Sequence, residues 1–141
     1  MLLSLVTLSA LAADPAPRFN HAAFYVVDLK TSATFYREVV GLKEIPEPFH
    51  DGKHAWFEVG PGLALHIISG ATSPLPKEKR NHFCLSVASM DAFIARLKAR
   101  QVSYEDLAGT KSAVTRRPDG VSQIYFQDPD GNWIEINDAK E

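Results

Sequence analysis

The sequence predicts an α+β fold in which two βαβββ modules pair into a curved mixed sheet. The first observation behind this prediction is a repeat: an Asn-His pair opens an apolar strand at His21 and again at His82, sixty-one residues later. The second is that each strand runs on into a helix with an acidic residue or a Ser as its cap. The third is that each half ends in an apolar strand with a candidate metal ligand at its centre, His66 in the first half and Glu135 in the second. A duplicated unit with ligand-type residues at matching places predicts one metal site, built between two similar halves.

The first half has the pattern of a strand, a helix and three further strands. Asp28 or Thr31 is the expected N-cap of the helix, and Gly41 stands where a left-handed C-terminal residue is expected. The turn Gly60-Pro61-Gly62 predicts a hairpin between the last two strands. The expected elements are a strand over 21–28, a helix over 29–40, a strand from about Lys43, and hairpin strands over 55–59 and 64–68.

The second half repeats this order. Ser89 is the expected N-cap of a helix that carries Phe93, Ile94 and Leu97 on its buried side. The tight turn Asp128-Pro129-Asp130-Gly131 leads into the last strand. The expected elements are a strand over 82–88, a helix from Ser89 to about Arg100, and strands over 114–117, 123–127 and 133–137.

The chain divides into a leader, two modules and a linker. Residues 19–70 form the first module, 71–80 the linker and 81–138 the second module, and 19–138 together form one domain. Residues 1–12 resemble a secretory signal, because an apolar run ends in a small-x-small cleavage pattern, and 13–18 form a Pro-rich lead-in. These features predict a periplasmic or secreted protein. Because no Lys or Arg precedes the run, a cytoplasmic protein with an uncleaved leader stays open as the alternative.

Composition excludes several classes of protein. An apolar content of 45% and a charged content of 23% are ordinary for a soluble globular domain. A net charge of -2 gives no reason to expect nucleic acid or an anionic membrane as a partner. The apolar leader is too short to span a bilayer, so no membrane span is predicted. Cys84 is the single cysteine, which excludes an internal disulfide framework.

Each expected strand has an apolar face and a second face with polar or aromatic side chains. In the last strand, Ile134 and Ile136 share one face and Glu135 lies on the other, because side chains alternate along a strand. The apolar faces suit packing against the helices, and the second faces line a cavity if the sheets curve. The side chains expected on the second faces are His21, Tyr25, Trp56, His66, His82, Gln123, Tyr125 and Glu135.

Four of these residues have the side chains of a metal site. Imidazole nitrogens and a carboxylate suit one divalent first-row ion, and Ni²⁺, Zn²⁺, Fe²⁺ and Mn²⁺ are all compatible with them. A carboxylate in a partly dry cavity costs free energy unless it is paired or metal-bound, which favours a functional role for Glu135. The predicted ligands are His21, His66, His82 and Glu135. His50 and His54 lack the repeat relation and are expected to face solvent, and Cys84 is expected to be a small residue of the cavity wall.

Short motifs spread over residues 19–138 indicate a family. They are Asn20-His21, Val27-Asp28-Leu29, Phe35-Tyr36-x-x-Val39-x-Gly41-Leu42, Asn81-His82-Phe83-x-x-Ser86-Val87 and Asp128-Pro129-Asp130-Gly131-x-x-Ile134-Glu135. With these motifs the chain resembles the vicinal oxygen chelate superfamily, which includes glyoxalase I, extradiol dioxygenases and bleomycin-binding proteins. The resemblance implies paired modules that cup one divalent metal at the four predicted ligands. It also implies a homodimer, because in many relatives the site lies between two subunits.

The resemblance further implies a metal-dependent lyase or isomerase of the glyoxalase I type. Such an enzyme acts on a small molecule with vicinal oxygens through a metal-stabilised enediolate. Glu135 and Tyr125 are the expected catalytic residues, and the substrate would contact Tyr25, Trp56, Gln123 and Tyr125. Glyoxalase I uses Arg and Asn for glutathione at the positions where this chain has Tyr25 and Gly70, so the use of glutathione stays open.

Two alternatives stay open beside this function. His21, His82 and Glu135 also form the ligand set of Fe(II) extradiol ring-cleaving dioxygenases, in which Tyr125 matches a tyrosine of the site. This alternative requires His66 to stay unligated, since oxygen and a catechol need that position. The other alternative is a non-enzymatic small-molecule-binding protein of the bleomycin-resistance type, although such binders lack the four ligands.

Overall fold

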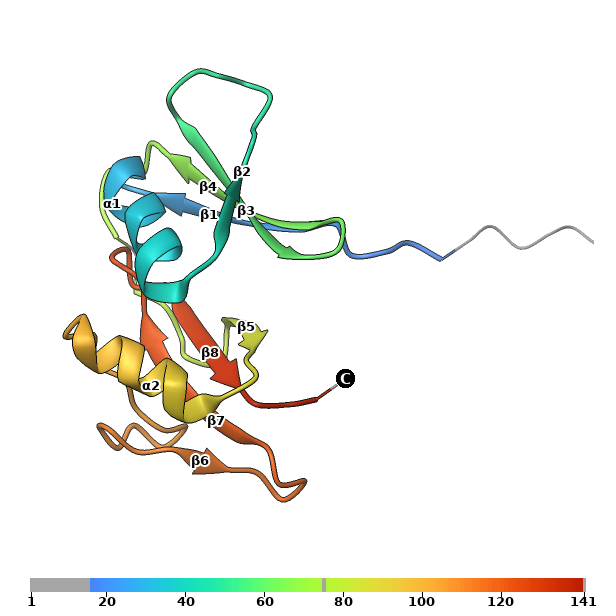
Figure 1. Cartoon of the computed structure of the whole chain (residues 1–141). Coiled ribbons are helices and arrows are strands. Elements are labelled where there is room, and N and C mark those ends of the chain that lie inside the picture. Colours follow the sequence, from blue (N-terminus) through green and yellow to red (C-terminus); the bar gives the residue numbers. More distant parts are fainter. Residues whose placement is uncertain (1–15, 75, 141) are drawn as a thin grey trace, which may run out of the picture.

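The computed structural model describes residues 16–74 and 76–140, so the expected leader over residues 1–12 lies outside the described residues. The elements, in chain order, are β1 (His21–Val26), α1 (Leu29–Thr34), η1 (Phe35–Val40), β2 (Lys43–Ile45), β3 (His54–Gly60), β4 (Leu63–Ser69), β5 (His82–Ser86), α2 (Met90–Ala99), β6 (Thr115–Arg116), β7 (Ser122–Gln127) and β8 (Trp133–Asn137). The two modules lie one above the other in Figure 1, with their helices on the same side of the molecule. The predicted α+β fold of two βαβββ modules is confirmed.

Each module forms one four-stranded mixed sheet with the same connectivity. The strand orders are β1-β4-β3-β2 and β5-β8-β7-β6. In both sheets the first strand of the module runs parallel to its last, and the other neighbours are antiparallel. The register repeats as well, because His66 lies opposite Ala23 on β1 and Glu135 lies opposite Cys84 on β5. His66 and Glu135 therefore occupy equivalent positions in the two modules.

The first helix begins and ends where the sequence predicts. The Asp28 carboxylate accepts the N–H of Thr31 at 2.6 Å, which satisfies one of the free donors at the helix start. Gly41 ends the helix in the left-handed conformation, with a φ of 88°. The last six residues, η1, are π-helical, with the N–H of Gly41 bonded to the carbonyl of Tyr36. Any other residue would be strained at Gly41, because L side chains rarely adopt this positive φ.

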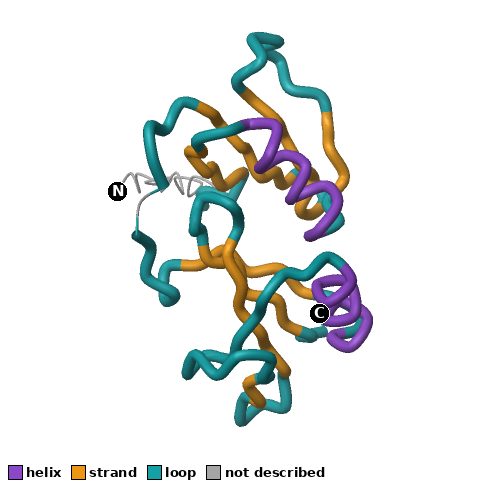
Figure 2. The backbone as a smooth tube through the Cα atoms, turned by 90° about the vertical axis from the view of Figure 1, so that its left-hand side faces the viewer, coloured by secondary structure: helices purple, strands orange, loops and turns teal. Residues whose placement is uncertain are grey.

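One hydrophobic core joins the two modules in the described part of the chain. The helices lie next to each other over the apolar faces of the two sheets (Figure 1, Figure 2). Phe24 of β1 packs edge-on against Phe83 of β5, and Phe35 of η1 packs against Phe126 of β7, with both ring-centroid distances at 6.1 Å. Because side chains alternate along a strand, the faces that carry the candidate site residues point away from this core.

The turn between β7 and β8 attaches the second module to the first. Asp128 and Asp130 are only 5% and 4% exposed. The Asp130 carboxylate accepts the N–H of Val27 at 2.8 Å and the hydroxyl of Ser32 at 2.9 Å. The Asp128 carboxylate accepts the Tyr36 hydroxyl at 2.7 Å and two backbone N–H groups of its own turn. The sequence predicts this segment as a tight turn, and the structure adds that it joins the modules.

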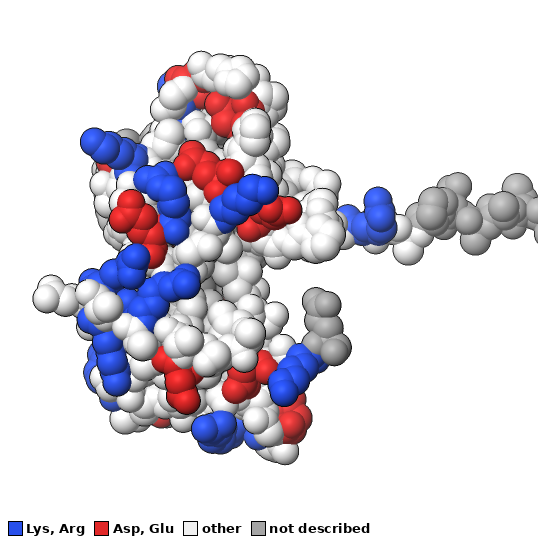
Figure 3. Space-filling view, in the orientation of Figure 1, with Lys and Arg blue, Asp and Glu red and all other residues white. Residues whose placement is uncertain are grey.

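Charged side chains are mixed on the face drawn in Figure 3. Lys and Arg lie beside Asp and Glu over both modules, so neither sign dominates this face. Among the described residues, no helix combines the length and the apolar character that crossing a membrane requires.

We expect Asp128→Asn to lower the free energy of unfolding by about 2–3 kcal/mol. The side-chain NH₂ of Asn would replace one carboxylate oxygen, so a buried hydroxyl or N–H group that now donates to Asp128 would lose its acceptor. Burial and the charge of Asp128 raise the pKa of Tyr36 well above its usual range, so this phenol is protonated and needs its acceptor. Urea unfolding followed by circular dichroism measures the loss.

The matched control is Asp119→Asn, the same change in an exposed turn, where the effect should stay within about 0.5 kcal/mol. Equal losses in the two variants would mean that the buried turn does not stabilise the junction.

Candidate metal site and cavity

The first pair of predicted ligands lies on the outer face of the first sheet. His21 on β1 and His66 on β4 have stacked imidazole rings, with centroids 4.2 Å apart and planes 10° apart. Trp56 on β3 lies directly opposite His66 and stacks on it as well, at 3.9 Å and 2°. Desolvation first, and then the neighbouring His21 and His54, lower the pKa of His66, which favours the neutral imidazole that binds metals. We call His21 and His66 the first half-site.

The second pair lies on the equivalent face of the second sheet. Nε2 of His82 on β5 is 3.1 Å from Oε2 of Glu135 on β8. The same Oε2 accepts the Tyr125 hydroxyl at 2.6 Å. Gln123 in turn donates to the Tyr125 oxygen at 2.8 Å. We call His82 and Glu135 the second half-site. The predicted substrate residues Tyr125 and Gln123 lie beside it.

The other carboxylate oxygen of Glu135 is held by two weaker donors. Oε1 accepts the side-chain amide of Asn137 at 3.1 Å and the thiol of Cys84 at 3.4 Å. Burial alone would raise the pKa of Glu135, but the hydrogen bonds from Tyr125, Asn137 and Cys84, with the charge of His82, outweigh it and lower the pKa. Glu135 is therefore an ionised carboxylate at neutral pH although it is only 6% exposed.

Cys84 is a protonated donor in this arrangement. Desolvation of the sulfur, followed by the charge of Glu135, raises the pKa of the Cys84 thiol to about 12. A thiol with this pKa is neither a nucleophile nor a thiolate ligand at neutral pH. The expectation that Cys84 is a passive wall residue needs one addition, because its sulfur also contacts Glu135 and Asn137.

The repeat histidines both present the same ring nitrogen to the site. Nδ1 of His21 lies 2.8 Å from the side-chain oxygen of Asn20, and Nδ1 of His82 lies 2.8 Å from the carbonyl of Lys79. An oxygen acceptor at Nδ1 favours a proton there, and Nε2 is then the nitrogen that can bind a metal once it carries no proton. Metal-binding histidines are held in this way in proteins.

The donor set of the second half-site fits a divalent first-row ion. It pairs an imidazole nitrogen with a carboxylate oxygen, and His82 Nε2 and Glu135 Oε2 lie 3.1 Å apart, close enough that both could bind one ion. In the absence of a metal, the same contact is an ion pair when His82 is protonated.

Within one chain the two half-sites remain apart. Among the described residues, no group of three or more His, Cys, Asp or Glu side chains is close enough to hold one metal. A cavity of about 460 Å³ lies beside His21 and His66, and all of its lining residues belong to the first module. The stacked rings of His21 and His66, with planes 10° apart, would have to change their relative orientation for both to bind one metal. Rotation about χ2 of one histidine supplies this change.

The remaining predicted residues have different surroundings. Tyr25 is 59% exposed at the end of β1. The indole nitrogen of Trp56 is buried and has no hydrogen-bond partner among the described residues. His50 is exposed as predicted, but the prediction for His54 was wrong: its side chain is 17% exposed, because it stacks on Phe49 and its Nδ1 lies 2.9 Å from the Asp51 carboxylate.

Two contributors to the site were missed from the sequence. Asn137 falls on the correct face of the last strand, two residues after Glu135, and this spacing is a signal that a sequence reading can use. Lys79 belongs to the linker, and no sequence pattern relates its carbonyl to His82.

Comparisons with known proteins identify the family. The family described as "Glyoxalase/Bleomycin resistance protein/Dioxygenase superfamily" matches residues 18–136. Over 127 residues the chain is 31% identical to the uncharacterized protein YwbC of Bacillus subtilis (strain 168). This match covers 86% of this chain and 97% of that protein. Over 125 residues it is 30% identical to "Glyoxylase I 4" of Arabidopsis thaliana, covering 83% of this chain and 68% of that protein. The solved structure of "Oxidase ChaP-H1" has a TM-score of 0.71 at 25% identity, covering 89% and 98% of the two chains. The chain belongs to the glyoxalase/bleomycin resistance/dioxygenase superfamily.

We expect Tyr125→Phe to raise the pKa of Glu135, because the variant removes the closest donor to its carboxylate. A lowered folded-state pKa contributes stability above the unfolded pKa, and this contribution is lost as the pH falls through the folded pKa. The variant should therefore begin to lose stability at a higher pH than the wild type during acid titration. Carboxyl ¹³C NMR of Glu135 in metal-free protein measures the shift directly.

The control is Tyr104→Phe, which removes a buried hydroxyl that donates to the Ser112 carbonyl at 3.3 Å, away from the site. An unchanged Glu135 titration in Tyr125→Phe would mean that this hydrogen bond does not hold the carboxylate ionised.

Proposed function

We propose that this protein is a metal-dependent lyase or isomerase of the glyoxalase I type that acts on a small molecule with vicinal oxygens. The observation that carries the proposal is the second half-site, where an ionised, buried carboxylate and an imidazole nitrogen lie 3.1 Å apart. The similarity to the Arabidopsis protein named as a glyoxylase I supports the reaction type. A carboxylate beside a metal is the arrangement that moves a proton between carbons next to a carbonyl.

The metal would be held by His21, His66, His82 and Glu135, and it supplies Lewis acidity to a carbonyl oxygen of the substrate. The two oxygens of Glu135 divide the remaining work. Oε2, which faces His82 and Tyr125, would be the oxygen that holds the metal. Oε1 is held only by the Asn137 amide at 3.1 Å and the Cys84 thiol at 3.4 Å, so it is the better acceptor for a substrate proton. We infer that Oε1 takes the proton from one carbon and returns it to the next.

We propose that the complete site forms between two subunits. Each chain carries both half-sites on faces that point away from its core, and the described residues bring no more than two ligand-type groups together. A C₂ dimer allows His21 and His66 of one chain to meet His82 and Glu135 of the partner subunit, and symmetry then gives two equivalent sites.

The cavity at the first half-site suits an uncharged, apolar substrate group. Its walls include Ile45, Trp56 and Leu63, and its one charged lining residue is Glu58. None of its lining residues is Lys or Arg, which are the usual partners of substrate carboxylates. These walls favour a neutral small molecule over glutathione.

The second candidate function is Fe(II)-dependent ring cleavage, and one observation favours it. The His66 ring is stacked between Trp56 and His21, so its neighbours can keep it as a packing residue. His21, His82 and Glu135 would then form the three-ligand set of a non-haem iron site. The similarity to a solved oxidase supports this candidate.

Elemental analysis of purified protein tests the metal site. We expect about one divalent ion per chain in the wild type, and a loss of at least 10-fold in metal affinity for His82→Ala and for Glu135→Gln. His50→Ala, which removes an exposed histidine, is the matched control and should bind as the wild type does. A wild-type protein that binds no divalent ion would contradict the proposal.

His66→Ala separates the two candidate enzymes. We expect this variant to lose metal and the turnover of methylglyoxal hemithioacetal if His66 is the fourth ligand. Full Fe²⁺ binding and a catechol charge-transfer band in the variant would instead favour ring cleavage.

Mixing two defective proteins tests the site between subunits. His66→Ala and Glu135→Gln disrupt different half-sites, so a heterodimer of the two regains one intact site if the ligands come from both chains. Random reassembly after unfolding should restore about one quarter of the wild-type metal content above the level of the separate variants. No recovery would mean that each site belongs to one chain.

A further inference from the structure

A second cavity, of about 440 Å³, is lined by residues of both modules and of the linker. It shares no lining residue with the cavity beside His21 and His66. Its apolar walls include Phe24 of β1 and Phe83 of β5, whose rings pack edge-on with centroids 6.1 Å apart, and Trp133 of β8. This volume and these aromatic walls are typical of a small-molecule site.

The charged side chains around this cavity are cations. Lys77 and Arg80 of the linker line it, and none of its lining residues in the described part of the chain is Asp or Glu. The cavity at the first half-site has the opposite character, because its one charged lining residue is Glu58. The whole chain has a net charge of -2, so two cations around one cavity do not follow from its composition. Their charge favours an anion as the ligand.

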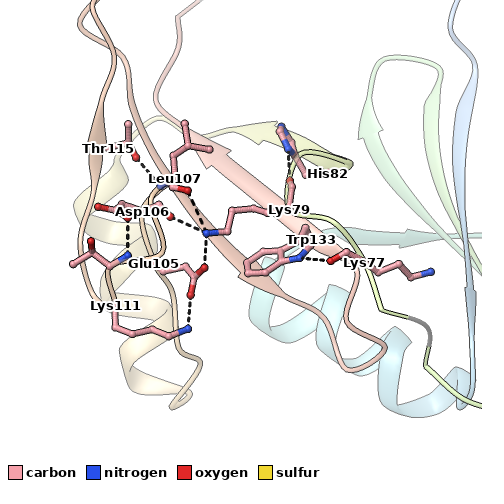
Figure 4. A network of polar contacts seen from close by, with 10 residues as sticks. Lys77, Lys79, His82, Glu105, Asp106, Leu107, Lys111, Thr115 and Trp133 are labelled. Carbon is pink, nitrogen blue, oxygen red and sulfur yellow. Dashed lines mark hydrogen bonds and ion pairs between the residues drawn. The ribbon is translucent and has the colours of Figure 1, made fainter.

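The protein itself does not neutralise these two cations. The third basic residue of the linker, Lys79, is paired, with its ammonium 2.5 Å from the Glu105 carboxylate. Lys77 and Arg80 are exposed and form no ion pair with any residue that the structure describes. The side chains of Lys77 and Lys79 leave the linker in opposite directions (Figure 4). Lys77 and Arg80 therefore remain available to a ligand.

The wall at Trp133 is held in place before any ligand binds. Its indole N–H donates to the carbonyl of Lys77 at 3.1 Å (Figure 4). The ammonium of Lys79 lies 5.0 Å from its ring centroid, within the range of cation–π attraction. The adjacent Asn132 is only 6% exposed, and its side-chain amide donates to the Asp128 carboxylate at 2.8 Å. Walls that are fixed in this way lose little conformational freedom when a ligand binds.

We propose that this cavity is a binding site for a small aromatic carboxylate. The guanidinium of Arg80 suits a carboxylate, because its planar fork can donate two parallel hydrogen bonds, and Lys77 adds a second positive charge. The aromatic ring of the ligand packs against Phe24, Phe83 and Trp133.

The site adjoins the second half-site, because His82 also lines the cavity. The proposal nevertheless needs neither a bound metal nor a particular protonation state of His82, since the charge that binds the ligand comes from Lys77 and Arg80. It therefore goes beyond the proposed lyase function and does not rest on it.

Titration of metal-free protein with benzoate, followed by ¹H–¹⁵N NMR, tests the location of the site. The chain has two tryptophans, Trp133 in this cavity and Trp56 in the cavity at the first half-site, so their indole N–H signals report on the two cavities separately. Trp56→Phe assigns the two signals. We expect benzoate to shift the signal of Trp133 and to leave that of Trp56 in place.

Two further probes separate the charge of the ligand from its ring. Benzamide has the ring without the charge, and acetate has the charge without the ring. We expect each to bind at least about 10-fold more weakly than benzoate, because each lacks one of the two interactions. Equal affinities for benzoate and benzamide would contradict the role of the two cations.

Arg80→Gln and Lys77→Met each remove one cation from an exposed position, so both variants should fold. We expect each to weaken benzoate binding at least about 5-fold and to leave benzamide binding unchanged. Arg100→Gln changes an exposed arginine that does not line the cavity, and this matched control should bind benzoate as the wild type does.

Undiminished benzoate binding in a protein that carries both Lys77→Met and Arg80→Gln would overturn the proposal. A benzoate shift confined to the Trp56 signal, or no shift of either signal, would overturn it as well. All of these measurements use metal-free protein, so they give an answer even if the chain binds no divalent ion. Failure of the metal site and failure of the carboxylate site are therefore distinguishable.

Discussion

The second module is organised around one carboxylate that stays ionised inside the protein. Burying a charge costs several kcal/mol unless its lone pairs are satisfied, and Glu135 meets this demand with neutral donors on β5, β7 and β8. Its contacts with protein are Tyr125, Asn137, Cys84 and the imidazole of His82, and none of these is Lys or Arg. Neutral donors keep the carboxylate charged without cancelling its charge. The imidazole of His82, 3.1 Å from the carboxylate, adds a positive charge beside it when it is protonated.

The two half-sites share their geometry and differ in their chemistry. Both lie on the parallel pair of strands in their sheets, and His66 and Glu135 have the same register position. In the first module this position carries a ring that stacks with Trp56 and His21, and its pKa is lowered, which favours the neutral form. In the second module the position carries a lowered-pKa carboxylate. The two modules thus share one scaffold. The residue at the equivalent position decides whether it adds a neutral nitrogen (His66) or an anionic oxygen (Glu135) to the outer face of its sheet. In the proposed dimer, joining two such faces would give a site with both kinds of donor.

The features that depend only on residues near one another in the sequence could be predicted from the sequence. Alternation of side chains placed Glu135 and His66 on the outer faces, and the caps at Asp28 and Ser89 fixed the helix starts, because each of these features is set within a few residues. The features that were missed depend on contacts between distant segments. Asp130 was predicted as part of a turn, yet its carboxylate bonds Val27 and Ser32 about one hundred residues away. Lys79 reads as a solvated linker residue for the same reason, since nothing near it in the chain indicates Glu105 or His82.

The burial that stabilises one chain also separates its two half-sites. The apolar faces of both sheets, with the helices between them, form a shared core, and the buried turn at Asp128 and Asp130 fixes the modules in this arrangement. Side chains that alternate along a strand must then send the ligand-type residues to the opposite faces. A single chain cannot turn these faces toward each other without opening its core and breaking the carboxylate junction. A second copy can cover both faces with no such loss. Under the proposed site between subunits, the packing that stabilises the monomer would be the reason that the ligands come from two chains.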